Sequence, residues 1–522
     1  MNAGKRIAGV LAGVLAAVAA GGASYAGDPG PVRVETDKGV VEGVREDGVR
    51  TWKGIPYAAP PVGELRWEAP REAAAWDGVL PADEFEGPCA QPRGNIPGIP
   101  GDDEDCLYLN VYAPEGADGD LPVMVWFHGG GNTYGAARQY DPTRLAENGA
   151  VVVTVDYRQG VFANLTGPSL DGDRVESGNY GLQDQQAALE WVRANASGFG
   201  GDEGNVTVFG ESGGGFDVCA HLVSASSEGL FDRAVMQSSP CAAPDWAPGL
   251  EESRAWTGEI AASLDCDDAE CLRERSAAEL LDAADAVLDE GVGFIEYQPV
   301  VGGPVMPVST REALEAGRVN DAEVLLGINR DEMQMMPAAE EAATGTPMTE
   351  EDYRARLELH FGGDAGSVEA EYPASDFDNP GKAYGAVLTD SDWALPLAET
   401  RELLGERVPT FTYRLAEDDT PWFAGLDAPC WPVDSIHMVD VAFLFDSPIF
   451  EPRNARHDRL ADVMTERWTE FARGGDPDGP GSWEPYAEDR DAWDLSSDGE
   501  RGIDFEDEHL VDFWAGLHAR ES

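Results

Sequence analysis

A serine stands between glycines at residues 210–214, in the order Gly-Glu-Ser-Gly-Gly, directly after the apolar run "NVTVF". A serine at an ordinary turn needs no such neighbours, whereas one that projects from a sharp strand-to-helix bend needs backbone packed closely on both sides. Ser212 is therefore a candidate nucleophile. The alternative is a glycine-rich turn with an incidental serine, because such pentapeptides are common by chance.

A second glycine-rich motif, "HGGG" at residues 128–131, follows the apolar run "VMVWF". Glycine lets backbone N–H groups approach an anion, and such donors stabilise the negative charge that develops on an acyl oxygen. Alone, this motif is equally compatible with a flexible turn. Two such motifs, each after an apolar run and in this order, favour the machinery of a serine hydrolase over two unrelated turns.

A serine hydroxyl attacks only when a base removes its proton, and that base must be a histidine oriented by a carboxylate. In this arrangement the acid and then the histidine follow the serine along the chain. Asp331 and Glu332 come just after the apolar run "AEVLLGIN", where an acid is expected. His437 is the favoured base because it precedes an apolar segment and lies beyond the run "VPTFTYRL".

The remaining histidines that follow Ser212 are less favoured as the base. They are His221, His360, His457, His509 and His518. His457 opens an amphipathic helix, and His509 and His518 lie in the acidic tail, so all three are expected at the surface. His221 is expected to pack or to give polar support on the helix after Ser212.

These side chains need a framework of strands and helices to position them. Continuous apolar runs at 121–127 and 150–157 are typical of strands covered on both faces. Leu182, Leu189 and Val192 recur at helical spacing before "NVTVF", which predicts a strand–helix–strand unit in a mostly parallel sheet. Further strands are expected at 233–239, 322–329 and 408–415, and short antiparallel edge strands at 32–57.

Helix-rich insertions separate the later strands, and Leu460, Met464, Trp468 and Phe471 mark an amphipathic helix near the end. No flexible linker marks a domain boundary. The fold class expected is α/β, with a large, mostly parallel central sheet, helices on both faces and long helical insertions. Residues 27–522 are expected to form a single catalytic domain with cap-like insertions.

The charge balance excludes several classes of partner. The chain has 522 residues with 36 basic and 98 acidic side chains, a net charge of −62. This disfavours nucleic acid and anionic membrane surfaces as partners, and it suits a solvated surface or a salt-adapted source. Neither an EF-hand spacing nor HExxH occurs, so no metal site is expected.

The first 26 residues resemble a secretory signal rather than part of the fold. Lys5 and Arg6 precede an apolar stretch that ends in Ser24-Tyr25-Ala26, a small-x-small cleavage pattern. Cleavage is expected after Ala26, giving an exported chain with no stable membrane insertion; an uncleaved anchor is the alternative. No other stretch has the roughly 18 apolar residues of a membrane span.

Export permits disulfides among the seven cysteines. Cys89 and Cys106 flank a Pro/Gly-rich loop, and Cys266 and Cys271 lie close together. Cys241 and Cys430 are then left as a third candidate pair, with Cys219 as an unpaired, buried thiol. Spacing alone does not determine these pairings.

Several longer blocks resemble the type-B carboxylesterase/lipase family, which includes para-nitrobenzyl esterases and cholinesterases within the α/β-hydrolase fold. They are "WKGIPYAAPPVGELRWEAP" (52–70), "EDCLYLNVY" (104–112), "SGNYGLQDQQAALEWVRANASGFGGDEGNVTVFGESGGG" (177–215), "GLFDRAVMQSS" (229–239) and "FARGGDPDGPGSWEPY" (471–486). The resemblance covers essentially all of the mature chain. Its density is more specific than any single motif.

The resemblance implies a role for particular residues. Ser212 matches the family nucleophile, Glu332 the acid because the second member of the Asp-Glu pair is used, and His437 the base, with Asp440 in a nearby acidic slot. The oxyanion amides are those of Gly130, Gly131 and Gly213, with Ser238 and Glu211 supporting the site. Cys89–Cys106 resembles the family's N-terminal disulfide, and Cys266–Cys271 lies where a second is usual.

Three residues depart from the family pattern. Gly213 replaces the usual alanine after the nucleophile, which keeps the amide but adds backbone freedom. Asn132 replaces an apolar residue after HGGG, which would make the pocket wall more polar. Met333 replaces the glycine after the acid, which leaves the form of that turn open.

The sequence thus predicts a secreted serine hydrolase that acts on small-molecule carboxylic esters without a cofactor. A non-catalytic, cholinesterase-like binding or adhesion protein is the rival from another class. A lactonase, thioesterase or amidase would share every residue named. A lipase is less favoured because no amphipathic lid is evident. Acyl specificity and oligomeric state stay open.

Overall fold

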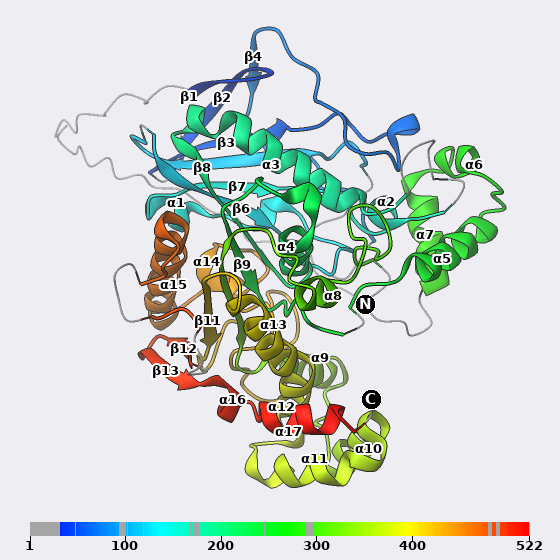
Figure 1. Cartoon of the computed structure of the whole chain (residues 1–522), viewed down its shortest axis with the longest axis vertical. Coiled ribbons are helices and arrows are strands. Elements are labelled where there is room, and N and C mark those ends of the chain that lie inside the picture. The colour runs from blue at the N-terminus through cyan, green and yellow to red at the C-terminus, as the bar shows by residue number, and fades with distance from the viewer. Residues whose placement is uncertain are drawn as a thin grey trace, which may run out of the picture.

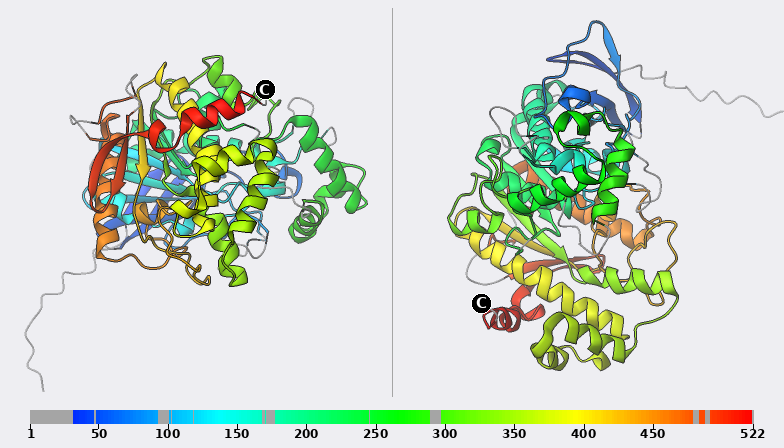
Figure 2. Two further views of the ribbon diagram at one scale, coloured as in Figure 1. Left: turned by 90° about the horizontal axis from the view of Figure 1, so that it is seen from below. Right: turned by 90° about the vertical axis from the view of Figure 1, so that its right-hand side faces the viewer.

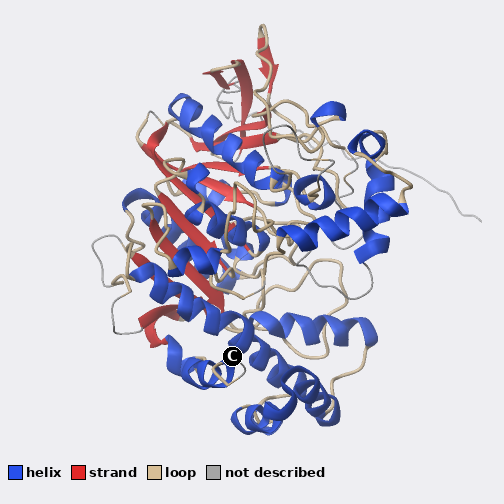
Figure 3. Cartoon of the chain, turned by 45° about the vertical axis from the view of Figure 1, so that its right-hand side comes forward, coloured by secondary structure: helices blue, strands red, loops and turns tan. Residues whose placement is uncertain are grey.

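A computed structural model gives the structure of the chain at residues 32–46, 48–92, 101, 103–117, 119–167, 170, 177–244, 246–288, 297–478, 483–486 and 491–520. The predicted signal segment, residues 1–26, lies outside the described residues. A large twisted sheet runs through the molecule with helices on both sides (Figures 1 and 3).

Within the described residues, the sheet has 13 strands in the order β1-β2-β3-β5-β7-β6-β8-β9-β10-β11-β12-β13, with β4 paired to β2. Its central strands from β7 to β12 run parallel. The central strands are β6 (Leu121–Phe127), β7 (Val151–Val155), β8 (Gly201–Glu211), β9 (Arg233–Gln237), β10 (Glu323–Asn329), β11 (Thr410–Leu415) and β12 (Asp491–Ser496). The predicted fold class is therefore confirmed.

The strands at the two edges are mostly antiparallel. The N-terminal edge pairs β1 with β2, β2 with β3, and β3 with β5, which then joins β7. These strands are β1 (Val32–Thr36), β2 (Gly39–Glu46), β3 (Val49–Pro56), β4 (Val79–Pro81) and β5 (Tyr108–Pro114). At the other edge β13 (Gly499–Asp504) forms a hairpin with β12.

Alternate side chains of the central strands enter two different cores. Val123 and Val125 of β6 belong to a core with α3 (Tyr180–Phe199) and α4 (Gly213–Val223). Met124 and Trp126 of the same strand belong to a core with α15 (Ala455–Gly474). Both faces of β6 are thus covered, which explains its continuous apolar sequence.

Long helical insertions interrupt the strand order after β9 and after β10. The first contains α5 (Leu250–Ser263), α6 (Ala269–Arg273), α7 (Ala277–Leu288) and α8 (Thr310–Glu315). The second contains α9 (Met335–Thr344), α10 (Glu350–Phe361), α11 (Ala365–Glu371), α12 (Pro380–Thr389) and α13 (Leu395–Gly405). Helices α5–α7 of the first group lie apart from α10 and α11 of the second (Figures 1 and 2).

Short helices complete the described structure. They are α1 (Thr143–Glu147), α2 (Gly160–Asn164), α14 (Val441–Leu444), α16 (Phe505–Glu508) and α17 (Val511–His518). A π-helical turn, Asp390–Ala394, joins α12 to α13. No helix in the described part of the chain combines the length and the apolar character that crossing a bilayer requires.

The structure contains the Cys89–Cys106 and Cys266–Cys271 disulfides that the sequence predicts. The expected pairing of Cys241 with Cys430, with Cys219 unpaired, is wrong. Cys219 of α4 is bonded to Cys241, with their Cα atoms 5.4 Å apart, and Cys430 is free and exposed. The reason is topological: β8 and β9 are parallel neighbours, so the helix that follows β8 lies beside the loop that follows β9.

Candidate active site

Ser212 occupies the bend between β8, which ends at Glu211, and α4, which begins at Gly213. Its φ of 53° is in the left-handed region, which is strained for a residue with a side chain. The Ser212 amide donates a hydrogen bond of 3.0 Å to the Gln237 carbonyl, which fixes the bend to β9. A Cβ at Gly214 would lie 2.0 Å from the Phe127 carbonyl oxygen, so only glycine allows this close approach to β6.

His437 faces the serine. Its Nε2 atom lies 2.9 Å from the Ser212 Oγ, and its Nδ1 atom lies 2.6 Å from the Glu332 Oε2. A carboxylate only accepts hydrogen bonds, so Nδ1 carries the proton and Nε2 presents its lone pair to the serine hydroxyl. The Trp393 ring, in the π-helical turn, packs against the imidazole at a centroid distance of 4.8 Å.

Glu332 follows β10 in a single 3₁₀ turn, Glu332–Gln334, and is fully buried. Its Oε1 atom accepts hydrogen bonds from the Asn329 amide at 2.7 Å and from the Ser238 hydroxyl at 2.5 Å. The His437 amide donates to the Glu332 carbonyl at 3.1 Å. Both carboxyl oxygens are therefore occupied, which holds the carboxylate in one orientation towards the histidine.

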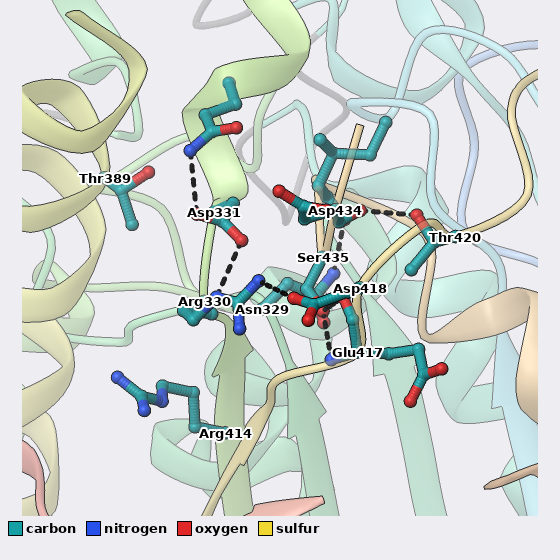
Figure 4. A network of polar contacts seen from close by, with 12 residues as sticks. Asn329, Arg330, Asp331, Thr389, Arg414, Glu417, Asp418, Thr420, Asp434 and Ser435 are labelled. Carbon is teal, nitrogen blue, oxygen red and sulfur yellow. Dashed lines mark hydrogen bonds and ion pairs between the residues drawn. The ribbon is translucent and has the colours of Figure 1, made fainter. Parts of the chain in front are cut away.

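Asp331, the other candidate acid, points elsewhere. Its side chain accepts hydrogen bonds from Arg330 at 2.9 Å and from Gln334 at 2.7 Å (Figure 4). Arg330 also reaches Asp418 at 2.8 Å, and the Asp331 amide donates to the Ser435 carbonyl. Asp331 thus ties the turn of Glu332 to the segment that leads to His437.

The two glycine-rich motifs meet at their backbones. A Cβ at Gly213 would lie 2.8 Å from the Gly131 nitrogen and 2.9 Å from the Asn132 nitrogen. Gly130 and Gly131 have φ values of 110° and 61°, and the Thr133 and Tyr134 amides donate to the Gly130 carbonyl. The predicted amide donors of residues 130, 131 and 213 therefore lie in one small region beside Ser212.

Two further buried carboxyl groups surround the histidine. Glu211 Oε1 lies 3.4 Å from His437 Nε2, and Asp440 accepts a hydrogen bond of 2.6 Å from Gln237. Burial raises the pKa of Glu211 and of Asp440. Burial lowers the pKa of His437, but the facing carboxylates of Glu211 and Glu332 outweigh it and raise that pKa to about 9. The site therefore stabilises the imidazolium that forms when His437 accepts a proton.

Sequence analysis missed three contributors to the site. Gln237, at the end of β9, links Asp440 to Trp468, whose Nε1 donates to the glutamine at 3.0 Å. Asn329 donates its amide to Glu332, and Trp393 covers His437. Gln237 and Asn329 each end a parallel strand, and the carboxyl ends of such strands are where sites form. No comparable signal marks Trp393.

The departures at Asn132 and Met333 have clear structural settings. The expectation that Asn132 makes the pocket wall more polar does not fit the structure. Asn132 is only 4% exposed, and its amide nitrogen donates to Asp217 at 3.0 Å and to Gln298 at 3.1 Å. Met333 lies within the 3₁₀ turn, and its amide donates to Thr389 at 3.0 Å. This turn does not require a glycine.

Two histidines expected at the surface are buried. His457 contacts the Asp419 carbonyl at 2.9 Å, and His509 pairs with Asp390 at 2.6 Å. Both partners come from other elements of the chain, so the local sequence gives no sign of them. The His221 ring is hydrogen-bonded to Gln185 and Ser227. This fits the expected polar support of the helix that follows Ser212.

Several known proteins are similar to this chain. The sequence matches the model of the carboxylesterase family over residues 30–514. It is 40% identical over 319 residues to the para-nitrobenzyl esterase of Bacillus subtilis, a match that spans 57% of this chain and 62% of that protein's length. It is 35% identical to the fumonisin B1 esterase of Sphingopyxis macrogoltabida, covering 89% of this chain and 86% of that protein.

Two further relatives extend the comparison. The chain is 33% identical to the cocaine esterase of Oryctolagus cuniculus, covering 84% of this chain and 86% of that protein. A solved structure of PNB esterase superimposes with a TM-score of 0.76 at 30% identity, covering 92% of this chain and 98% of the other. The chain therefore has the α/β-hydrolase fold and belongs to the carboxylesterase family.

Proposed function

We propose that this carboxylesterase hydrolyses small-molecule carboxylic esters through a Ser212–His437–Glu332 triad and an acyl-enzyme intermediate. The observation that carries the proposal is the continuous chain from Ser212 Oγ to His437 Nε2 at 2.9 Å and from His437 Nδ1 to Glu332 Oε2 at 2.6 Å. These contacts satisfy the geometry that a nucleophile, a base and an orienting acid need.

In the first half of the reaction, Ser212 Oγ attacks the ester carbonyl as its proton passes to His437 Nε2. The carbonyl π-electrons move onto the oxygen, which the amides of Gly130, Gly131 and Gly213 stabilise. The tetrahedral intermediate then collapses, and the C–O bond to the alcohol breaks. His437 gives its proton to the departing alcohol, which leaves the acyl group on Ser212.

Water completes the cycle by the same route in reverse. His437 removes a proton from the water as its oxygen attacks the acyl carbon, and the proton returns to Ser212 as the acid is released. The Glu332 carboxylate stabilises the imidazolium in both halves. The hydrogen bonds from Asn329 and Ser238 hold that carboxylate in place.

The names of the relatives support an ester as substrate but differ in the ester involved: a para-nitrobenzyl ester, fumonisin B1 and cocaine. Acyl and alcohol preference are accordingly left open, and thioesters, lactones and amides share the same machinery. A binding protein that has lost catalysis is disfavoured because serine, histidine and glutamate are all present at hydrogen-bonding distance.

We also propose that residues 1–26 are removed on export and that residues 27–522 form a single catalytic domain. Three disulfides support an oxidising destination. Expression of the full chain in a secreting host tests this: protein recovered from the medium should begin at Gly27. A protein retained in the cell with residues 1–26 intact would contradict it.

The proposal is tested by Ser212→Ala measured against a short-chain nitrophenyl ester. We expect loss of turnover by at least about a thousand-fold, because the nucleophile itself is removed. Ser224→Ala is the matched control, since Ser224 is buried but donates to the remote Val305 carbonyl. Near-wild-type turnover in folded Ser212→Ala would refute the triad. For the active wild-type protein, a panel of ester, thioester, lactone and amide substrates would define the substrate class.

A further inference from the structure

A buried chain of polar side chains lies behind the loop that carries Gly130 and Gly131. It starts at Asn132, whose φ of 54° is left-handed and whose side chain is 4% exposed. The two hydrogens of its amide nitrogen point to Asp217 Oδ1 at 3.0 Å and to Gln298 Oε1 at 3.1 Å. Asn132 therefore connects the glycine loop to two other parts of the fold.

One branch of this chain returns to the loop itself. Gln298 Nε2 donates to the Gly131 carbonyl at 3.2 Å, and that carbonyl also accepts from the Thr133 hydroxyl at 3.0 Å. The peptide between Gly131 and Asn132 is thus held at its oxygen by Gln298, and Asn132 is held through its side chain. These contacts leave this peptide little freedom to rotate.

The other branch is anchored deep in the helices. Gln185 of α3 donates to Asp217 Oδ2 at 2.7 Å, and His221 Nε2 lies 2.7 Å from Gln185 Oε1. Burial lowers the pKa of His221 to about 3, so its ring is neutral. With Nε2–H donating to Gln185, Nδ1 accepts from the Ser227 hydroxyl at 2.8 Å. Every side-chain nitrogen named in the chain then has a hydrogen-bond partner.

Asp217 and His221 lie on α4, the helix that begins directly after Ser212. The chain therefore links the helix that carries the nucleophile to the loop that carries the proposed oxyanion donors. The two already touch at Gly213, where a Cβ would lie 2.8 Å from the Gly131 nitrogen. A displacement of either one would change the distance from the amides to the reacting oxygen.

We propose that Asn132, Asp217 and Gln298 are positioning residues that set the oxyanion-hole amides of Gly130 and Gly131 relative to Ser212. This inference rests on the proposed function. On this proposal, the three side chains do not touch the substrate. They stabilise the transition state by fixing the backbone amides that bind the oxyanion. The substrate's ground state gains little from them, whereas the oxyanion depends on the amides that they fix.

The test is Asn132→Gly, which tolerates the positive φ and removes the side chain with its amide. We expect kcat to fall by about ten-fold or more with KM changed by less than about two-fold, because donor geometry matters in the transition state. The inhibition constant of an arylboronic acid, which forms a tetrahedral adduct on serine, should rise by the same factor. If Asn132 served only the stability of the fold, the inhibition constant of the boronic acid would not change.

Asn195→Ala is the matched control. Asn195 is an equally buried asparagine, 4% exposed, that bonds to Asp37 and to the Trp191 carbonyl away from the site. This variant should lose stability without a change in kcat. Gln298→Leu removes the contacts of Gln298 to the Gly131 carbonyl and to the Asn132 side chain. It should show the same selective loss of kcat even if Asn132→Gly does not fold.

The possible results separate this inference from the proposed function. Unchanged kcat and boronate affinity in folded Asn132→Gly or Gln298→Leu would overturn the positioning role while leaving the triad intact. A rise in KM alone would also overturn it, because that result indicates direct substrate contact. Turnover that survives in the Ser212→Ala variant would instead refute the triad, and the positioning role with it.

Discussion

Glu211 Oε1 lies 3.4 Å from Nε2 of His437, and neither carboxyl oxygen of Glu211 has a hydrogen-bond partner among the described residues. A buried carboxyl group without partners is costly to ionise, so burial raises its pKa. A positive imidazolium next to it removes that cost. Glu211 and His437 therefore titrate as a pair, and each favours the charged form of the other.

Replacing Glu211 with glutamine should change the pH profile of the enzyme. The amide removes an anion that favours the imidazolium, so the pKa of His437, about 9 with Glu211 present, should fall. A general base acts in its neutral form, so the acidic limb of kcat/KM should move to lower pH. The limiting kcat should drop by roughly ten-fold, because the imidazolium of the transition state is less stabilised.

A kcat/KM profile for hydrolysis of a nitrophenyl ester measures this shift. Asp331→Asn is the matched control, because Asp331 is a partly buried carboxyl group next to Glu332 that faces Arg330 and Gln334 and not the histidine. An acidic limb that stays in place, or moves upwards, in Glu211→Gln would show that Glu211 does not act on His437.

The Gly213→Ala substitution should slow the reaction even though it restores the residue usual in the family. The added Cβ would lie 2.8 Å from the Gly131 nitrogen and 2.9 Å from the Asn132 nitrogen, both backbone atoms that cannot turn aside. The oxyanion loop must therefore shift. We expect kcat to fall by about ten-fold with little change in the melting temperature. An unchanged kcat would contradict this prediction, because it would mean that the loop of Gly130 and Gly131 can shift without any effect on catalysis.

The Cys219–Cys241 disulfide should contribute to stability. It closes a loop with a sequence separation of 22, and such a loop restricts the unfolded chain by about 3 kcal/mol. Cys219→Ala/Cys241→Ala should therefore lower the denaturant midpoint, whereas Cys430→Ser should not, because Cys430 is free and exposed. Thiol titration of the denatured, non-reduced protein should find one thiol per chain; three would mean that one of the three disulfides is absent.

The acidic surface should make stability depend on salt. A net charge of −62 repels itself in the folded state, and salt screens that repulsion over a Debye length of about 10 Å at 0.1 M. The melting temperature should rise by several degrees between low salt and roughly 1 M salt. Indifference to potassium chloride, or a fall in melting temperature, would contradict a salt-adapted surface.

Residues whose roles follow from local sequence could be predicted. Ser212 is marked by its glycines, and the runs at 121–127 and 322–329 became β6 and β10 because buried parallel strands are continuously apolar. The resemblance to a known family singled out Glu332 over Asp331. Composition and spacing alone do not distinguish Glu332 from Asp331, because the difference depends on which carboxylate the 3₁₀ turn directs at His437.

Contacts between distant segments could not be predicted. Cys219 and Cys241 are neighbours only because β8 and β9 pair side by side, and spacing between cysteines does not carry that information. His509 lies in an acidic tail that suggested exposure, yet Asp390 pairs with it across 119 residues of sequence. The acidic strands β12 and β13 lack the apolar pattern that identifies the central strands.

The most direct test of the account is to map the site of covalent labelling by a fluorophosphonate, with and without the base. Mass spectrometry of the labelled wild-type protein should place the adduct on Ser212, and the folded His437→Gln variant should label at least about a hundred-fold more slowly, because no base then takes the serine proton. An adduct on another serine, or labelling of Ser212 at the same rate without His437, would contradict the proposed mechanism.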